Sequence, residues 1–374
     1  MNTRTLIALL ASLAVLVALA VAVSQSQRKT TGSGDLLLPD LHSQLNTIGT
    51  IIVRTGGDKT IATIAKQDDR WGVAERSGYP ADIGRIRRNL IGLAEARILE
   101  EKTSNPELYD RLGVADIEKE AATGVRLDLG SASGTTSVIL GNTGVGGGER
   151  AYARRAGETT SWLVSGSFDV PRETAQWLDQ GILDIVAKRV HSVVISHPRG
   201  KTLRVEKASP ETQDFTVTGV PGDRELSFPS AGNSIGAALT DLTLEDVEPA
   251  AGFSPGEVQP VVARYETFDG LVVEARTWQL PAGPRVRFSV SVDDALAARF
   301  APAPAGAAPA GANDGTPQAA EPAAAPRKSP DAVKAEAAEL QARLAAWVYT
   351  LPAHKGEQLT RTLDDLLAPR PPTK

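Results

Sequence analysis

The sequence predicts an α+β fold of two tandem similar units, each an antiparallel sheet plus a helix, after an N-terminal transmembrane helix and before a C-terminal helical segment. Three observations predict this arrangement. Residues 6–23 are apolar and uncharged. A pattern of short strands and one helix begins near residue 50 and restarts near residue 190. An Ala/Pro-rich stretch then separates the second unit from a last amphipathic helix.

Composition limits the class of protein. The chain has 374 residues, of which 41% are hydrophobic, so it can form two domains with buried cores. Its net charge of −5 argues against a nucleic-acid-binding protein, which normally presents a basic face. The absence of cysteine excludes disulfides, a lipoprotein anchor and cysteine-based catalytic or metal sites.

The apolar run Leu6–Val23 determines where the rest of the chain is located. As a helix it spans about 27 Å, close to the thickness of a thin hydrocarbon core. Arg4 precedes it and Arg28-Lys29 follow it, which suits a span of the inner membrane. The alternative is a secretory signal cleaved at Ala20-Val21-Ala22. Both alternatives export the remainder of the chain.

With an anchor, residues 1–5 form a short cytoplasmic tail and residues 24–47 form a tether. We therefore expect a single-pass protein of the bacterial inner membrane, held through residues 6–23, with the bulk of the chain in the periplasm.

The first α+β unit is expected over residues 48–185. Apolar and β-branched segments between glycine-rich turns predict its strands, which are Thr50–Arg54, Thr60–Lys66, Arg70–Ala74, Ala96–Leu99, Val125–Leu129, Ser137–Leu140, Ala151–Arg155 and Trp162–Ser165. A helix follows Tyr79-Pro80-Ala81-Asp82, because Ile83, Ile86, Leu90 and Leu93 recur on one helical face. We predict a loop over Asn105–Gly113 and a second helix from Asp169 to Leu178.

The second unit is expected over residues 186–300, where the pattern repeats. Its predicted strands are Val190–Ser196, Arg199–Leu203, Phe215–Thr218, Leu244–Val247, Val261–Phe268, Leu271–Leu280 and Arg285–Val292. Its predicted helix is Ser230–Leu242, and Asp269-Gly270 indicates a hairpin turn.

The C-terminal part begins with residues 301–330, an Ala/Pro-rich segment that predicts a disordered linker. Residues 331–368 then predict two helices, Asp331–Tyr349 and Gln358–Leu367. Their apolar stripe implies that they dock on the body of the protein or on another protein.

Several segments could carry chemistry, but each has a simpler structural interpretation. Gly141–Gly148 resembles a phosphate-binding loop, yet no Lys-Ser/Thr pair or helix follows it, so a hairpin loop is favoured. His191 and His197 lie at opposite ends of one predicted strand, about 20 Å apart, which is too far to share a metal.

For the charged and aromatic residues, too, structural roles are favoured over chemical ones. The acidic pairs Asp68-Asp69, Glu100-Glu101, Asp293-Asp294 and Asp364-Asp365 suit turns and helix ends. Arg85, Arg87 and Arg88 could meet lipid phosphates, although a solvated helix face is favoured. Five tryptophans are expected in the core, with carbohydrate stacking as the alternative, namely Trp71, Trp162, Trp177, Trp278 and Trp347. The sequence thus assigns no catalytic, cofactor-binding or metal-binding residue, and we expect no cofactor.

Taken in order, several short motifs resemble the family of bacterial single-span proteins grouped as domain of unknown function 4340. The motifs, besides the apolar run, are Trp71-Gly72-Val73, Tyr79-Pro80-Ala81-Asp82, Leu108-Tyr109 with Leu112-Gly113, Val138-Ile139-Leu140-Gly141, Tyr152-Ala153-Arg154, Trp177-Leu178-Asp179 with Leu183, Thr267-Phe268-Asp269-Gly270-Leu271, Trp347-Val348-Tyr349 with Leu351-Pro352, and Asp364-Asp365-Leu366-Leu367. The resemblance implies an exported domain tethered to the inner membrane, often encoded beside Gld-type ABC transporter components. It transfers no catalytic motif.

Three hypotheses about function follow. The favoured one is a non-enzymatic, membrane-anchored accessory protein that binds an ABC transporter or another envelope component. The alternative is a periplasmic module that binds a glycan or a lipid head group through Trp and Arg side chains. The third is a hydrolase with a carboxylate pair in one pocket.

Overall fold

The computed structural model describes residues 34–300 and 328–369. The chain divides into two compact units, the first ending at Asp179 and the second beginning at Gln180. Each unit combines helices with one large antiparallel sheet, which confirms the predicted mixed architecture of two similar units.

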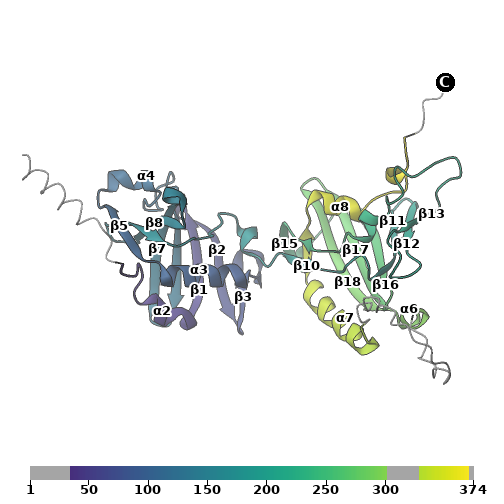
Figure 1. The fold of residues 1–374 in the computed structure, drawn as a ribbon, viewed down its shortest axis with the longest axis horizontal. Coiled ribbons are helices and arrows are strands. Elements are labelled where there is room, and N and C mark those ends of the chain that lie inside the picture. The colour runs from purple at the N-terminus through teal and green to yellow at the C-terminus, as the bar shows by residue number, and fades with distance from the viewer. Residues whose placement is uncertain (1–33, 301–327, 370–374) are drawn as a thin grey trace, which may run out of the picture. The chain divides into compact units, whose positions relative to one another are not determined.

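The first unit is built on a nine-stranded sheet in the order β4-β3-β2-β1-β6-β7-β8-β9-β5. Its strands are β1 Ile48–Thr55, β2 Lys59–Gln67, β3 Arg70–Val73, β4 Tyr79–Pro80, β5 Ile98–Thr103, β6 Val125–Ser131, β7 Gly134–Thr143, β8 Arg150–Arg155 and β9 Ser161–Ser165. Helix α3, Ile83–Glu95, crosses one face of this sheet (Figure 1). It begins at Asp82, whose side chain accepts a hydrogen bond from the Arg85 amide, and it buries Ile86, Leu90 and Leu93.

The strands and the main helix predicted for this unit are confirmed, with two differences. Within the segment predicted as a tether, helix α2, Leu41–Gln44, already packs on the unit, because Leu37 and Leu41 are buried. The loop predicted over Asn105–Gly113 contains a short helix, α4, Tyr109–Leu112, which ends at Gly113 in a left-handed conformation.

The second unit is built on an eight-stranded sheet in the order β13-β12-β11-β16-β17-β18-β19-β15. Its strands are β11 Val190–Ser196, β12 Thr202–Glu206, β13 Thr216–Thr218, β15 Asp246–Pro249, β16 Val261–Thr267, β17 Leu271–Leu280, β18 Gly283–Val292 and β19 Trp347–Thr350. Two further strands, β10 Gly181–Leu183 and β14 Leu242–Thr243, form a separate pair. Short helices α5, Asn233–Gly236, and α6, Asp294–Arg299, complete this part.

The two sheets match strand for strand. Apart from the small edge strand β4, the order 3-2-1-6-7-8-9-5 in the first unit becomes 13-12-11-16-17-18-19-15 in the second. A register shift also recurs: it lies between Ile48 and Thr50 where β1 pairs with β6, and between Val190 and Ser192 where β11 pairs with β16. This agreement identifies the chain as a structural duplication.

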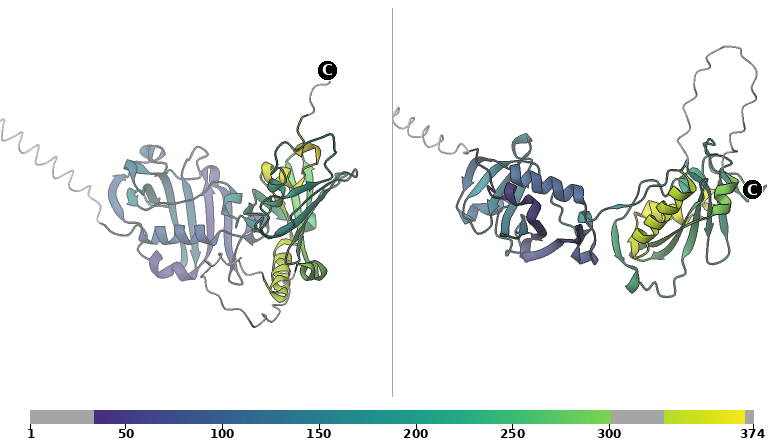
Figure 2. Two further views of the ribbon diagram at one scale, coloured as in Figure 1. Left: turned by 45° about the vertical axis from the view of Figure 1, so that its right-hand side comes forward. Right: turned by 90° about the horizontal axis from the view of Figure 1, so that it is seen from below.

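The segment after residue 327 completes the second copy. Strand β19 lies between β18 and β15, the place that β9 holds in the first sheet. Helix α7, Pro330–Leu344, precedes β19 and packs on β18 and β17 (Figure 2). Helix α8, Ala353–Leu359, also contacts this sheet, so the expectation that the C-terminal helices dock on the body is confirmed.

Four predicted helices differ from the structure. The helix predicted over Asp331–Tyr349 ends at Leu344, because the aromatic and β-branched residues that follow form β19. The helix predicted over Gln358–Leu367 is replaced by α8 and a 3-10 turn at Asp364–Leu366.

The other two predicted helices are shorter because neighbouring elements hold their chain. Only a 3-10 turn at Thr174–Trp177 forms in the segment Asp169–Leu178, where the Trp177 indole donates to the Pro171 carbonyl and Leu178 bridges Ala81. In Ser230–Leu242 only α5 forms, and the Asn233 side chain there accepts from the Phe215 amide.

The membrane prediction concerns residues outside the described part of the chain. In residues 34–300 and 328–369, none of the helices has the length and apolar character needed to cross a membrane. The apolar run 6–23 and the linker predicted over 301–330 lie outside these residues, except for the last three of the linker.

Candidate functional site

The site lies on the face of the first sheet that α3 does not cover. Side chains alternate along β6, so Leu127 and Leu129 point into the core while Arg126 and Asp128 point to the opposite face. Part of this outer face is covered by residues 104–124, which connect β5 to β6 and which we name the cover segment.

A small apolar cluster seats the cover segment. Tyr109, Val114, Ala115 and Ala122 of the segment pack against Ile139 of β7. Close backbone contact adds to this, since a Cβ atom at Gly141 would lie 2.2 Å from the Leu112 carbonyl oxygen. A larger residue at Gly141 would therefore push the segment off the sheet.

Arg154 of β8 binds the cover segment from the sheet side. It is only 2% exposed, and its Nε donates to the Val114 carbonyl at 2.8 Å. One Nη donates to the Glu158 carbonyl at 2.8 Å, and the other pairs with the carboxylate of Asp116. The guanidinium also stacks over the Tyr109 ring, 4.6 Å from its centroid. A single side chain thus contacts the segment at three places, Tyr109, Val114 and Asp116.

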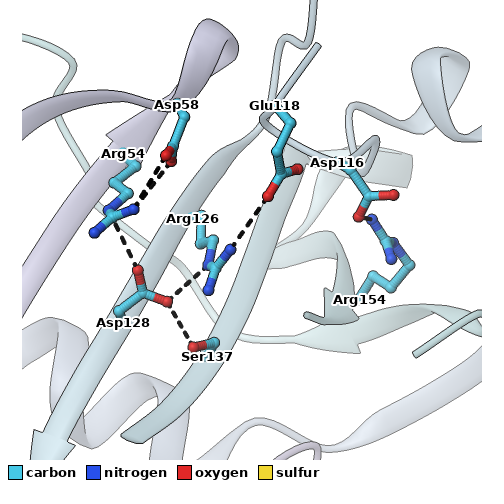
Figure 3. Close-up of polar contacts among 8 residues, drawn as sticks. All are labelled: Arg54, Asp58, Asp116, Glu118, Arg126, Asp128, Ser137 and Arg154. Carbon is cyan, nitrogen blue, oxygen red and sulfur yellow. Dashed lines mark hydrogen bonds and ion pairs between the residues drawn. The ribbon is translucent and has the colours of Figure 1, made fainter. Parts of the chain in front are cut away.

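Beside the cover segment lies a network of charged side chains centred on Asp128 (Figure 3). The Asp128 side chain is 8% exposed and accepts from Arg126 Nε at 2.7 Å and from the Ser137 hydroxyl at 2.5 Å. Arg54 Nε lies 3.6 Å from its second oxygen, and Arg54 also pairs with Asp58. Arg126 in turn faces Glu118 of the cover segment at 3.6 Å.

The network borders an open groove of about 640 Å³. The groove is lined by residues of the cover segment, of β6 and β7, and of the turn after β8, namely Asp116, Glu118, Lys119, Arg126, Ser137, Ile139, Ala156 and Gly157. Lys119 is exposed and forms no ion pair with any residue in the described ranges. The groove therefore presents charges of both signs above a small apolar floor.

The second unit keeps the scaffold and changes this chemistry. Asp128 lies opposite Ser137 in the first sheet, whereas the equivalent positions of the second sheet are Arg264 opposite Glu274. The connection between β15 and β16 covers only residues 250–260, about half the length of the cover segment. Since the second sheet forms with other side chains at these positions and a shorter connection, Asp128, Ser137 and the long cover segment are not requirements of the sheet.

The residues that line the groove include none of the acidic pairs and no residue of the glycine-rich loop that the sequence singled out. Gly141–Gly148 ends β7 and forms the turn before β8, as the hairpin interpretation predicts. Asp68 and Asp69 form a tight turn with positive φ, and Asp293 caps α6. Glu100-Glu101 lie in β5, and Asp364-Asp365 lie in a 3-10 turn.

The two histidines are held by backbone carbonyls in the second unit. His191 is buried with its Nδ1 2.8 Å from the Lys207 carbonyl, and its ring packs against those of Phe268 and Phe300. His197 Nε2 lies 3.2 Å from the Arg361 carbonyl. Within the part of the chain that the structure describes, no three His, Asp or Glu side chains gather as metal ligands.

The tryptophans pack as core residues to differing extents. Trp177 and Trp278 are buried, and Trp278 packs edge-on against Phe253. Trp71, Trp162 and Trp347 are partly exposed. No tryptophan is among the residues that line the groove.

Sequence reasoning missed the groove residues, although one signal was present. Arg126 and Asp128 stand two apart in a predicted strand, so they share a face. The sequence does not show, however, that this strand pairs with the strand of Ser137 or that residues 116–118 of the cover segment fold over it. Both arrangements depend on contacts between residues distant in sequence.

The fold and the groove together define a duplicated α+β protein with a charged groove on the outer face of its first sheet. Residues 71–254 match the family model of the domain of unknown function DUF4340, so this segment belongs to that family. The match confirms the family indicated by the short motifs. Neither the curated proteins nor the solved structures contain a match to the chain.

Proposed function

We propose that the chain is a non-catalytic accessory protein, anchored in the bacterial inner membrane by residues 6–23 with its two units in the periplasm. Its groove binds a protein partner, such as a component of an ABC-transporter-type envelope system. The observation that carries this proposal is the difference between the two copies: beside the groove of the first sheet Asp128 lies opposite Ser137, whereas the equivalent positions of the second sheet hold Arg264 opposite Glu274.

The groove suits a protein surface better than a small ligand. Small-molecule sites usually enclose most of the ligand within mainly apolar walls. Here the groove is open, and Glu118, Lys119 and Arg126 stand at its border with both signs of charge. Such complementary charges steer a protein partner and fix its orientation. A glycan-binding site would instead present an aromatic ring for stacking, and the lining residues include none.

The test uses two matched substitutions in the full-length protein. Arg126→Gln removes a groove cation whose Nε lies 2.7 Å from Asp128. Arg276→Gln removes an arginine of the second sheet that pairs in the same way with Glu274, also at 2.7 Å. We expect the wild type and the Arg276→Gln variant to co-purify a transporter subunit or another envelope protein from detergent-solubilised membranes, and the Arg126→Gln variant to lose it.

Two results would overturn the proposal. One is a wild-type protein that recovers no envelope partner, and the other is equal recovery by both variants. A protein that is fully released from membranes by alkaline carbonate would refute the anchor separately.

A further inference from the structure

The outward face of α3 combines exposed aliphatic and basic side chains. Ile83, Arg87 and Ile91 recur four residues apart along the helix, and both isoleucines are 42% exposed. Arg88 lies beside them and is also exposed. Neither Arg87 nor Arg88 forms an ion pair with any residue that the structure describes. Glu95 is the acidic residue at the end of this face.

The arginines of α3 differ in whether they are paired within the protein. Arg85 is tied to the protein by Asp82 at 3.5 Å and by Asp169 at 3.3 Å. Its charge is therefore neutralised internally, whereas the charges of Arg87 and Arg88 remain available to a ligand outside the chain.

The start of the described chain lies at the C-terminal end of α3. The Leu37 amide donates to the Ala96 carbonyl, and the Ile98 amide donates to the Asp35 carbonyl. Residues 24–33 separate this point from the apolar run 6–23 and reach at most about 35 Å when fully extended. If the run is inserted in a membrane, the end of α3 stays within that distance of the lipid surface.

The duplication supplies an internal comparison. The counterpart of α3 in the second unit is α5, a four-residue helix within a segment that has no arginine, residues 230–242. The exposed Ile/Arg face thus belongs to the copy that directly follows the apolar run.

We propose that the face formed by Ile83, Arg87, Arg88 and Ile91 lies on the anionic phospholipid surface of the membrane in which the protein is anchored. The arginines bind lipid phosphates, and the isoleucines enter the boundary between head groups and acyl chains. This contact orients the first unit on the membrane. The inference depends on the anchorage part of the proposed function.

The test uses the full-length protein in nanodiscs. Because the chain has no cysteine, a spin label can be placed at one site at a time. The labelled variants are Ile91→Cys on the face, and Lys119→Cys in the groove and Glu339→Cys in the second unit as exposed controls. Collisions with oxygen, which enters lipid, and with a water-soluble nickel complex report the surroundings of each label.

In nanodiscs containing phosphatidylglycerol we expect the label at residue 91 to be reached by oxygen and shielded from nickel, while both control labels stay in water. In phosphatidylcholine alone the label at 91 also stays in water. With Arg87→Gln and Arg88→Gln combined, the ratio of lipid-contacting to free label falls at least about tenfold. Glu95→Gln raises it, because one repulsive charge is removed.

A label at residue 91 that is equally accessible to nickel in both kinds of nanodisc overturns the inference, provided that the protein is inserted and circular dichroism shows it folded. A chain that does not insert into nanodiscs refutes the anchor instead. The two failures are therefore distinguishable.

Discussion

Substitution of Arg154 by methionine is the sharpest perturbation of the groove. Methionine keeps the apolar stem of the side chain but removes the donors to the Val114 and Glu158 carbonyls. Val114 is fully buried, so leaving its carbonyl without this donor costs about 1–3 kcal/mol. Loss of the guanidinium over Tyr109 adds about 1 kcal/mol. The pair with Asp116, which is half exposed, contributes little.

We therefore expect Arg154→Met to lower the unfolding free energy of the first unit by about 2–4 kcal/mol. Hydrogen exchange detected by mass spectrometry at increasing urea concentrations measures the unfolding free energy of each unit separately. Exchange is expected to accelerate in the cover segment and β8 and to stay unchanged in the second unit. The control Arg276→Met, at an exposed site, costs less than about 0.5 kcal/mol. A loss for Arg154→Met as small as that of the control refutes the role given to Arg154.

Three further predictions concern the second unit. Burial raises the pKa of Glu336, but hydrogen bonds from Arg189 and Lys328 outweigh this effect and lower the pKa overall. The ionised Glu336 therefore stabilises the fold above about pH 4.3, and this stabilisation is lost as the pH falls through the lowered pKa. Glu336→Gln is expected to remove this pH dependence from acid unfolding curves. Burial lowers the pKa of Lys207, opposed by the charge of Asp214 and aided by that of Lys188. Between this lowered pKa and the unfolded value of about 10.4 the unfolded state binds more protons, so the unfolding free energy rises with pH, and calorimetry of Lys207→Met is expected to show no such rise. Truncation after residue 300 removes β19 from between β18 and β15. The truncated protein is therefore expected to keep the calorimetric unfolding transition of the first unit and to lose that of the second. An unchanged transition of the second unit would contradict the topology.

The strands were predictable because each carries its own local signal. β11 and β17 were predicted to the residue, since apolar and β-branched side chains fill them and turns bound them. The first long helix was equally clear, because its apolar residues recur with helical spacing and Asp82 precedes it.

The errors arose where distant contacts override local preference. Trp347–Thr350 continues a helical pattern, but this segment closes the second sheet by pairing with β15 and β18. The groove was missed for the same reason, because Arg154 and Asp116 meet only after the cover segment folds across the sheet. Such long-range pairings leave no periodic trace in the sequence.

Photocrosslinking from the groove in living cells tests the central claim most directly. A photoreactive residue at position 119 probes the groove, and one at position 276 probes the corresponding face of the second sheet. The proposed function predicts a crosslink from 119 to a subunit of an ABC transporter or another envelope protein, abolished by Arg126→Gln, and none from 276. Equal crosslinking from both positions, or none from 119 in membranes that contain the full-length protein, would contradict it.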